Sequence, residues 1–303
     1  MDDYKKLDIY KSWIQSKLYS SKGNIHFYVY DEIFQKFRNK EIIFVEIGVK
    51  RGGSLLMWRD WLGPKARIIG IDLDPNAKKL EEYGFEIYIG DQSSTKFWTN
   101  FFEKVGMVDV ILDDGGHTNE NQIMTTINCT NHINDGGLLV IEDISANYAK
   151  KFFNPQKYSF INYSKFLIDD INVRSLVKKE REENIKKNSL NDKIYSIRFF
   201  SEFVIFEINR DKCIDTEFFW NKDLKDLNDN SIDKITNVDN YVNPRWSTDS
   251  YKGLLSSFVY FFSKVFFFIK YIPFSKYLVE KIILFKGKYY TRKISSKLKK
   301  YFE

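Results

Sequence analysis

Residues 109–117 read Asp-Val-Ile-Leu-Asp-Asp-Gly-Gly-His, and a Glu142-Asp143 pair follows 25 residues further along the chain. Each acidic cluster closes a short run of β-branched and aliphatic residues, 108–112 for the first and 138–141 for the second. Such runs, closed by Gly or Asp, are typical of buried parallel strands. If the two strands are neighbours in one sheet, their carboxyl ends lie about 4.8 Å apart.

This pairing would bring Asp114, Glu142 and Asp143 into one pocket, with His117 beside them. Three carboxylates do not share a cleft without a cation that balances their charge. A ligand set made of oxygens favours a hard divalent ion, Mg²⁺ before Mn²⁺ or Ca²⁺. The sequence therefore predicts a metal-assisted enzyme whose imidazole is placed to move a proton.

Strands and helices alternate around these clusters, which indicates a doubly wound, mostly parallel α/β sheet. A glycine turn at residues 48–54 leads from the first strand into a helix that begins near Leu55. Residues 1–40 are expected to form a helical lead before the sheet. The expected strands are 42–47, 67–71, 85–89, 108–112 and 138–141, with a helix at about 120–132 between the last two.

The pattern changes after Asp143. Residues 145–192 are expected to be a polar and aromatic insertion, with a solvated helix over the charged run 178–187. Only two residues separate the runs 194–200 and 203–208, too few for a crossover helix, so these runs should pair as an antiparallel hairpin. The expected segments are the lead at 1–40, a main domain at 41–210, a linker at 211–251 and a tail at 252–303.

Composition is that of a folded protein without a disulfide framework. A chain of 303 residues with 43% hydrophobic and 17% aromatic residues has room for one sizeable core. Cys129 and Cys213 match no disulfide pattern and no metal-ligand spacing, which favours reduced thiols in a cytosolic protein. The first residues lack the apolar core of a signal peptide, so secretion is not indicated.

The net charge of +6 is unevenly distributed. Residues 252–303 carry twelve Lys or Arg against two Glu, a balance of +10, which leaves −4 on residues 1–251. This asymmetry indicates an appended contact with an anionic surface and argues against a nucleic-acid partner. Lys264 and Lys270 interrupt the aromatic stretch 254–274, so it fits an amphipathic helix in the membrane interface better than a bilayer span. A helix packed on the protein body or on a second subunit fits this stretch about equally well.

The glycine turn and two further strand-ending acids indicate a nucleotide-type pocket. Glu46 ends the first strand, and Gly48 and Gly52 would let the backbone approach a ligand closely. The turn is not Gly-x-Gly-x-x-Gly, and no Gly-Lys-Ser/Thr phosphate loop is present, which argues against dinucleotide and ATP binding. Asp72 suits a carboxylate that accepts both hydroxyls of a ribose, and Asp91 ends the third strand, where an adenine ring would lie.

Six short motifs follow one another along the chain: Ser21-Lys-Gly-x-x-His26, Glu46-Ile-Gly-Val-x-x-Gly-Gly-Ser, Gly-x-Asp72, Gly-Asp91-Gln, Asp113-Asp-Gly-x-His117 and Ile-Glu142-Asp143. Together they resemble the metal-dependent sugar O-methyltransferases of the mycinamicin and macrocin type, whose relatives often carry the label cephalosporin hydroxylase. The resemblance covers about residues 20–210, and the basic tail is not part of the family's pattern. It implies a class I, Rossmann-like fold that binds S-adenosylmethionine (SAM), with a seven-stranded sheet whose last two strands form a hairpin.

The resemblance also implies roles for individual residues. Asp114, Glu142 and Asp143 correspond to Mg²⁺ ligands, and His117 corresponds to the catalytic base. For Asp113 a structural role is favoured, either orienting its neighbour or bonding to the glycine turn. The residues expected at the SAM site are Glu46, Gly48, Gly52, Ser54, Asp72, Asp91, Gln92 and Asp113.

Four further polar residues have less defined expectations. Lys22 and His26 belong to the first motif and either border the acceptor pocket or lie on the surface. Tyr148 follows the Glu142-Asp143 pair closely and is a candidate contact for the sugar. His132 is expected to end a helix and not to bind a ligand.

We therefore expect a cytoplasmic O-methyltransferase that uses SAM and Mg²⁺ on a sugar hydroxyl. The cation, bound through two vicinal hydroxyls, would lower the pKa of the attacking one, and His117 would take its proton. The acceptor would be a nucleotide sugar, a surface polysaccharide under synthesis or a natural-product glycoside. Residues 252–303 would allow peripheral contact with the inner face of the membrane, and a homo-oligomer is left open.

Two alternatives remain open at this point. The same fold could use its metal for hydroxylation, but a redox metal typically wants two histidines and a carboxylate, and this cluster offers one histidine. The protein could also be a non-catalytic, membrane-associated module of glycan assembly. The complete set of acids and histidine argues against that second alternative.

Overall fold

The computed structural model describes residues 2–149, 152, 157–176, 189–217, 299 and 301–302. Two compact units divide the chain, Met1–Thr216 with Thr291–Glu303 and Glu217–Tyr290. All elements described below belong to the first unit. The predicted helix at 178–187, most of the predicted linker and nearly all of the predicted tail lie outside the described residues, and the expected domain boundaries stay predictions.

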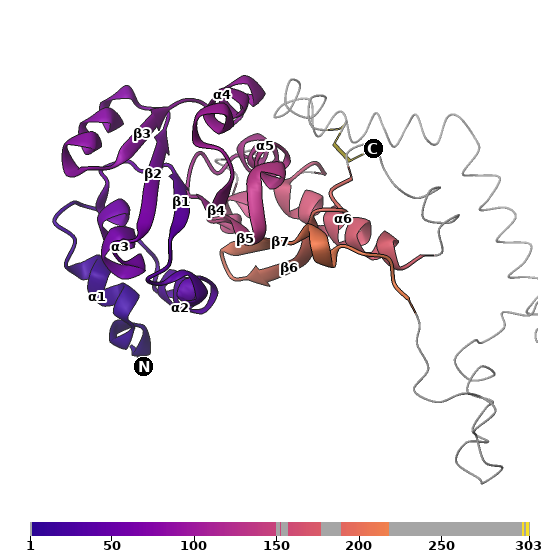
Figure 1. Ribbon diagram of the computed structural model, residues 1–303, viewed down its shortest axis with the longest axis horizontal. Coiled ribbons are helices and arrows are strands. Elements are labelled where there is room, and N and C mark those ends of the chain that lie inside the picture. Colours follow the sequence, from indigo (N-terminus) through magenta and orange to yellow (C-terminus); the bar gives the residue numbers. More distant parts are fainter. Residues whose placement is uncertain are drawn as a thin grey trace, which may run out of the picture. The chain divides into compact units, whose positions relative to one another are not determined.

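A seven-stranded sheet in the order β3-β2-β1-β4-β5-β7-β6 forms the centre of the first unit (Figure 1). β1 to β5 pair in parallel, and β7 is antiparallel to both β5 and β6. This confirms the predicted class I methyltransferase topology with its terminal hairpin. The strands are β1 (Ile42–Ile47), β2 (Ala66–Asp72), β3 (Glu86–Ile89), β4 (Val108–Asp113), β5 (Ile133–Ile141), β6 (Ile194–Phe200) and β7 (Phe203–Ile208).

Helices cover both faces of the sheet, as expected for a doubly wound fold (Figure 1). The α-helices are α1 (Asp8–Ile14), α2 (Asn24–Phe34), α3 (Gly53–Leu62), α4 (Thr95–Val105), α5 (Asn119–Cys129) and α6 (Phe160–Asn172). Short 3₁₀ helices in the described residues cover Asp3–Lys6, Gln35–Phe37, Pro75–Tyr83, Thr130–His132, Ile144–Tyr148, Val173–Ser175 and Arg210–Lys212. None of the helices in the described part of the chain has the length and apolar character needed to cross a membrane.

Alternate residues of the central strands enter two separate hydrophobic cores. In β4, Val110 and Leu112 join α1, α2 and α3 in one core, whereas Ile111 joins α4, α5 and α6 in the other. Each strand is apolar on both faces because both faces are covered. The helical lead therefore packs on the same face as α3, with Tyr30 of α2 against Trp58 of α3 at 4.8 Å between ring centroids.

The described elements correct the sequence prediction in two places and bear on one open alternative. The predicted insertion at 145–192 contains α6, whose amphipathic face buries Phe160, Tyr163 and Leu167. β5 begins at Ile133, five residues before its apolar run, because Ile133 pairs with Val108 ahead of an irregularity in the ladder. Near the end of the chain, the Phe302 ring contacts Tyr163 of α6, so this part of the predicted tail packs on the protein body.

Gly48 connects β1 to the glycine turn and is the tightest point of this edge of the sheet. Its φ is +86°, and a Cβ there would lie 2.2 Å from the carbonyl oxygen of Asp114. Gly84 also has a positive φ, +78°, but a Cβ there would meet only Arg59 at 3.7 Å. A side chain at Gly84 would therefore cause backbone strain alone, whereas one at Gly48 would also collide with a backbone atom.

We expect Gly48→Ala to lower the free energy of unfolding by about 3 kcal/mol, because a backbone atom cannot move aside as a flexible side chain can. Gly84→Ala should cost only about 1 kcal/mol, which is the strain of a left-handed alanine. Urea unfolding followed by circular dichroism measures both values. Equal losses in the two variants would contradict the close approach at Gly48.

Candidate active site

The carboxyl ends of β4 and β5 bring the two acidic clusters together. Asp113 pairs with Ile141 in the ladder, and the backbone N–H of Glu142 donates to the carbonyl of Asp113 at 3.0 Å. The N–H of Asp114 continues the pairing on the other side by donating to Ile47 of β1 at 3.1 Å. The predicted adjacency of these two strands is therefore confirmed.

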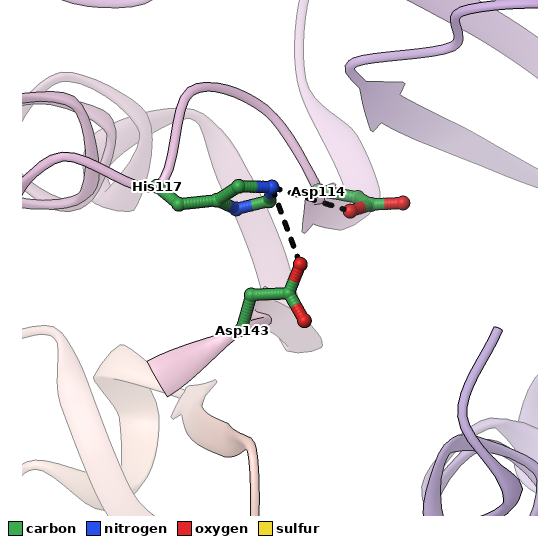
Figure 2. A group of neighbouring side chains, drawn as sticks. All are labelled: Asp114, His117 and Asp143. Atoms are coloured by element: carbon green, nitrogen blue, oxygen red, sulfur yellow. Dashed lines mark ion pairs between the residues drawn. The ribbon is translucent and has the colours of Figure 1, made fainter. Parts of the chain in front are cut away.

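Asp114, His117 and Asp143 form a group in which one potential ligand atom from each lies within 4.8 Å of the others (Figure 2). The Nε2 atom of His117 lies 3.2 Å from Oδ2 of Asp143 and 3.9 Å from Oδ1 of Asp114. His117 and Asp114 side chains are 15% exposed and Asp143 is 39% exposed, so the group is open to solvent on one side. Two carboxylates and one imidazole are donors that can hold a divalent cation.

His117 and Asp143 both have left-handed backbone conformations, with φ of 54° and 55°. This conformation is uncommon outside glycine, although Asp and His adopt it more readily than most residues. It persists where the surroundings hold it, and such positions cluster at functional sites. Near His117 one such support is visible, because the N–H of Gly116 donates to Oε1 of Gln92 at 2.8 Å.

Glu142 is fully buried, and both of its carboxylate oxygens have partners within the protein. The Tyr30 hydroxyl donates to Oε1, and the Lys22 ammonium donates to Oε2 at 2.9 Å. Burial raises the pKa of Glu142, while Lys22 acts in the opposite direction. Burial also raises the pKa of Tyr30 well above its ordinary value, which keeps its phenol protonated as a donor. The role of Glu142 as a metal ligand stays a prediction.

Lys22 is a central residue of this site. Its side chain is only 3% exposed, and Nζ donates to Oδ2 of Asp114 at 2.6 Å as well as to Glu142. Burial opposes its charge, but Asp114 and Glu142 outweigh burial and hold the pKa of Lys22 well above its ordinary value. The alternative of a surface position for Lys22 is therefore wrong.

His26 approaches the same carboxylates from α2. Its Nε2 atom lies 3.8 Å from Oε2 of Glu142 and 3.9 Å from Oδ1 of Asp143. Burial, helped by Lys22, lowers the pKa of His26 to about 4, so its imidazole is neutral at pH 7. The residue is 6% exposed, which excludes the surface alternative here too. The cluster thus has a second histidine nearby, whereas the sequence prediction counted one.

The glycine turn folds over the end of β1 as expected. Gly52 adopts a left-handed conformation and caps α3, and the Ser54 hydroxyl donates to Oε2 of Glu46 at 2.9 Å. The other oxygen of Glu46, Oε1, is buried without a hydrogen-bond partner. Burial raises the pKa of Glu46 to about 7, against the pull of Lys22. A buried acceptor that lacks a donor is what a bound ligand with an N–H or O–H group would satisfy.

The other predicted SAM-site residues form two pairs, with Asp72 and Asp91 nearer the surface and Gln92 and Asp113 in the interior. Asp72 accepts the N–H groups of Lys50 and Asp74, each at 2.9 Å, and Asp91, which is exposed, accepts that of Ser93 at 2.8 Å. Gln92 and Asp113 are buried and bond to each other, since Nε2 of Gln92 donates to both Asp113 oxygens at 2.9 Å.

Asp113 also orders the loop that carries His117. Its Oδ1 atom accepts the N–H of Gly115 at 3.0 Å, and burial raises its pKa. These contacts are those of the structural role favoured for Asp113. Contact of any of these residues with SAM stays a prediction.

The remaining candidates lie further from the group. His132 ends the 3₁₀ helix after α5 and stacks on Phe102 at 4.0 Å, which confirms it as a helix-end residue. Tyr148 is 60% exposed at the end of a 3₁₀ helix. Tyr30 is the site residue that sequence reasoning missed. Its spacing of four residues from His26 on α2 is the signal that could have found it, because such residues share a helix face.

The buried carboxyl of Glu46 makes a pH-dependent prediction for stability. Its pKa is about 7 in the folded protein and about 4.5 when exposed, so the folded state binds more protons between these values. The contribution of Glu46 to stability is therefore greatest below pH 4.5 and is lost as the pH rises through 7. Glu46→Gln keeps the shape and removes the titration. We expect the difference in unfolding free energy between pH 5 and pH 8 to change by about 2–3 kcal/mol in this variant. Identical pH profiles of variant and wild type in urea unfolding would contradict the assignment.

Comparison with known proteins identifies a methyltransferase domain in this chain. Residues 45–144 match a family model described as a methyltransferase domain. The mycinamicin VI 2″-O-methyltransferase of Micromonospora griseorubida is 31% identical over 180 residues, 54% of this chain and 45% of that protein. The demethylmacrocin O-methyltransferase of Streptomyces fradiae is 32% identical over 135 residues, 42% of this chain and 34% of that protein. The chain thus spans less than half the length of these curated relatives.

The solved structures agree with the topology. The MycE methyltransferase of the mycinamycin biosynthetic pathway, in complex with Mg, SAH and mycinamycin VI, superposes with a TM-score of 0.59 at 23% identity. The match covers 72% of this chain and 57% of that one. The class I methyltransferase fold is therefore established. The resemblance inferred from the six motifs is confirmed as well: the chain contains a methyltransferase domain and is similar to the sugar O-methyltransferases of the mycinamicin and macrocin type.

Proposed function

We propose that this protein is an O-methyltransferase that transfers the methyl group of SAM to a sugar hydroxyl with the help of Mg²⁺. The observation that carries the proposal is the group of Asp114, His117 and Asp143, whose ligand atoms lie within 4.8 Å of one another. It lies at the carboxyl ends of β4 and β5, the edge at which open α/β sheets bind their ligands. The class I fold supports the same assignment.

The residues around β1 to β3 fit SAM as the methyl donor. Glu46 has a buried oxygen without a donor, which the amino group of SAM would satisfy. Gly48 lets the backbone turn where a side chain would collide. Asp72 and Asp91 would hold the ribose and border the adenine, while Gly52 and Ser54 shape the turn and Gln92 and Asp113 support the loop behind it. MycE, the structural neighbour, is described as a complex with Mg and SAH.

The donor set also fits a hard divalent ion. We assign Asp114 and Asp143 as ligands, since both are acids of the group and carboxylate oxygens suit Mg²⁺. Glu142 is assigned as the third acid, on condition that its oxygens exchange their present partners, Tyr30 and Lys22. When bound, the ion would lower the pKa of an acceptor hydroxyl, and SAM would supply the electrophilic methyl group.

His117 would act as the general base of this reaction. With SAM bound, the imidazole would take the proton of the acceptor hydroxyl while the hydroxyl oxygen bonds to the methyl carbon. The bond between that carbon and the sulfonium sulfur would break, and S-adenosylhomocysteine would leave. The imidazole lies beside the proposed metal position, since its Nε2 atom is 3.9 Å from Oδ1 of Asp114 and 3.2 Å from Oδ2 of Asp143. General-base catalysis of this kind contributes a factor of about 10² to 10⁴ in rate.

A sugar hydroxyl is the acceptor class that the relatives favour. The name of one, the 8-demethyl-8-alpha-L-rhamnosyl tetracenomycin-C 2′-O-methyltransferase of Streptomyces olivaceus, contains a sugar, and it is 27% identical over 165 residues. We propose a nucleotide sugar, a surface glycan or a natural-product glycoside as acceptor. The basic residues 252–303 favour a glycan made at the membrane, and this finer assignment rests on sequence alone.

One observation supports the hydroxylase alternative and another argues against it. His26 and His117 both lie within 4 Å of Asp143, which resembles a site with two histidines and one carboxylate. However, His26 is not part of the group of described ligand atoms that lie within 4.8 Å of one another. Methyl transfer is therefore better supported than hydroxylation. A non-catalytic role would not account for the group of Asp114, His117 and Asp143.

We expect His117→Ala to bind SAM normally and to lose turnover by at least about 100-fold, because only the proton acceptor is removed. His132→Ala is the matched control, since this imidazole stacks on Phe102 and should leave turnover unchanged. Mass spectrometry of candidate sugars would follow the methyl gain, and calorimetry would follow SAM binding. EDTA should abolish turnover in the wild type. Normal turnover in His117→Ala, or a reaction that withstands EDTA, would contradict the proposed mechanism.

A further inference from the structure

Two positions for a positive charge lie side by side in this pocket and share Asp114. One oxygen of Asp114, Oδ2, accepts from Lys22, which also donates to Glu142. The other oxygen, Oδ1, faces His117 and belongs with Asp143 to the group that can hold a metal. Asp114 therefore pairs with the Lys22 ammonium through one oxygen and borders the candidate metal position with the other.

We propose that Lys22 is a built-in cation that competes with the divalent ion for Asp114 and Glu142 and so weakens the metal affinity of the site. The competition rests on the proposed function only in that a divalent ion binds at Asp114 and Asp143. Lys22 supplies the positive charge beside Asp114 and the fully buried Glu142. Binding of the ion then has to draw these carboxylates away from the ammonium.

Burial makes this competition strong. The Lys22 side chain is 3% exposed and Glu142 is fully buried, so water screens neither charge well. Both oxygens of Glu142 already have a partner, Tyr30 at one and Lys22 at the other, so an ion would have to share these oxygens or displace a partner. A divalent ion beside an ammonium is also repelled by it. Release of Glu142 from Lys22 and the repulsion between the two cations both oppose metal binding.

A purely structural role for Lys22 predicts a different result. Lys22 comes from the lead segment, two residues before α2, and its ion pairs also attach that segment to the ends of β4 and β5. If attachment were its only role, its loss would leave Asp114 and Glu142 less well placed. Metal affinity would then fall or stay constant. The two roles thus differ in the sign of the effect on metal binding.

The experiment is a calorimetric titration of the full chain with Mn²⁺ alone, in the wild type and in Lys22→Met. We expect Lys22→Met to bind Mn²⁺ at least about tenfold more tightly, and to gain more thermal stability from Mn²⁺ than the wild type does. Lys11→Met is the control for loss of one positive charge, because Lys11 is exposed and pairs only with Asp8 on the surface in the described structure. Its affinity for Mn²⁺ should equal that of the wild type.

Unchanged or weaker Mn²⁺ binding in a folded Lys22→Met protein overturns the proposal. If this variant does not fold, a crystal structure of the wild type with Mn²⁺ decides the question. Lys22 should then no longer lie within hydrogen-bond distance of Glu142, and an ion bound while both original contacts persist overturns the competition. Failure of the proposed function is distinguishable, because tight Mn²⁺ binding without methyl transfer to any sugar would leave the role of Lys22 intact.

Discussion

The parallel pairing of β4 with β5 is the constraint on which the rest of the site depends. Asp113 lies opposite Ile141, and the N–H of Glu142 bonds to the carbonyl of Asp113, so both strands end at the same level. Asp114, one residue past the end of β4, and Asp143, two residues past the end of β5, then lie with ligand atoms within 4.8 Å of each other. A slip of one residue would turn the side chains of one strand to the opposite face and separate the acids. Close packing of the side chains in the two cores holds the register against such a slip.

The same pairing gathers carboxylates at this edge of the sheet, and other residues of the site supply positive charge and hydrogen-bond donors to them. Glu46 and Glu142 are fully buried, and burial raises the pKa of both, which shows how poorly the site solvates negative charge. Lys22 supplies a positive charge to this edge from outside the sheet. Polar donors add to it, Tyr30 to Glu142 and Ser54 to Glu46. The carboxylates of the site are therefore partly neutralised by the protein's own side chains.

Local patterns in the sequence sufficed for the sheet and for the acids at its edge. The strands 42–47, 194–200 and 203–208 have the predicted bounds. The first lies between Glu41 and Gly48, and the other two lie on either side of the two-residue turn Ser201-Glu202. The contacts of Lys22 and Tyr30 could not be predicted, since both lie about 90 or more residues from their carboxylate partners and depend on how α2 packs. α6 was missed because its apolar positions are interspersed with polar residues inside a longer polar stretch.

The proposed site has two halves that different parts of the chain supply. The ends of β1, β2 and β3 form the proposed donor half, and the short sequence motifs around Gly48 and Asp72 encode it. The acid half depends on the lead segment, because Lys22 and Tyr30 hold Glu142 while His26 lies beside Asp143. The strained backbones of His117 and Asp143 lie in this second half. The lead segment also reaches the donor half, because the Ser16 hydroxyl donates to the carbonyl of Gly53 in the glycine turn at 2.9 Å. A change in the packing of the lead segment would therefore move groups in both halves of the site.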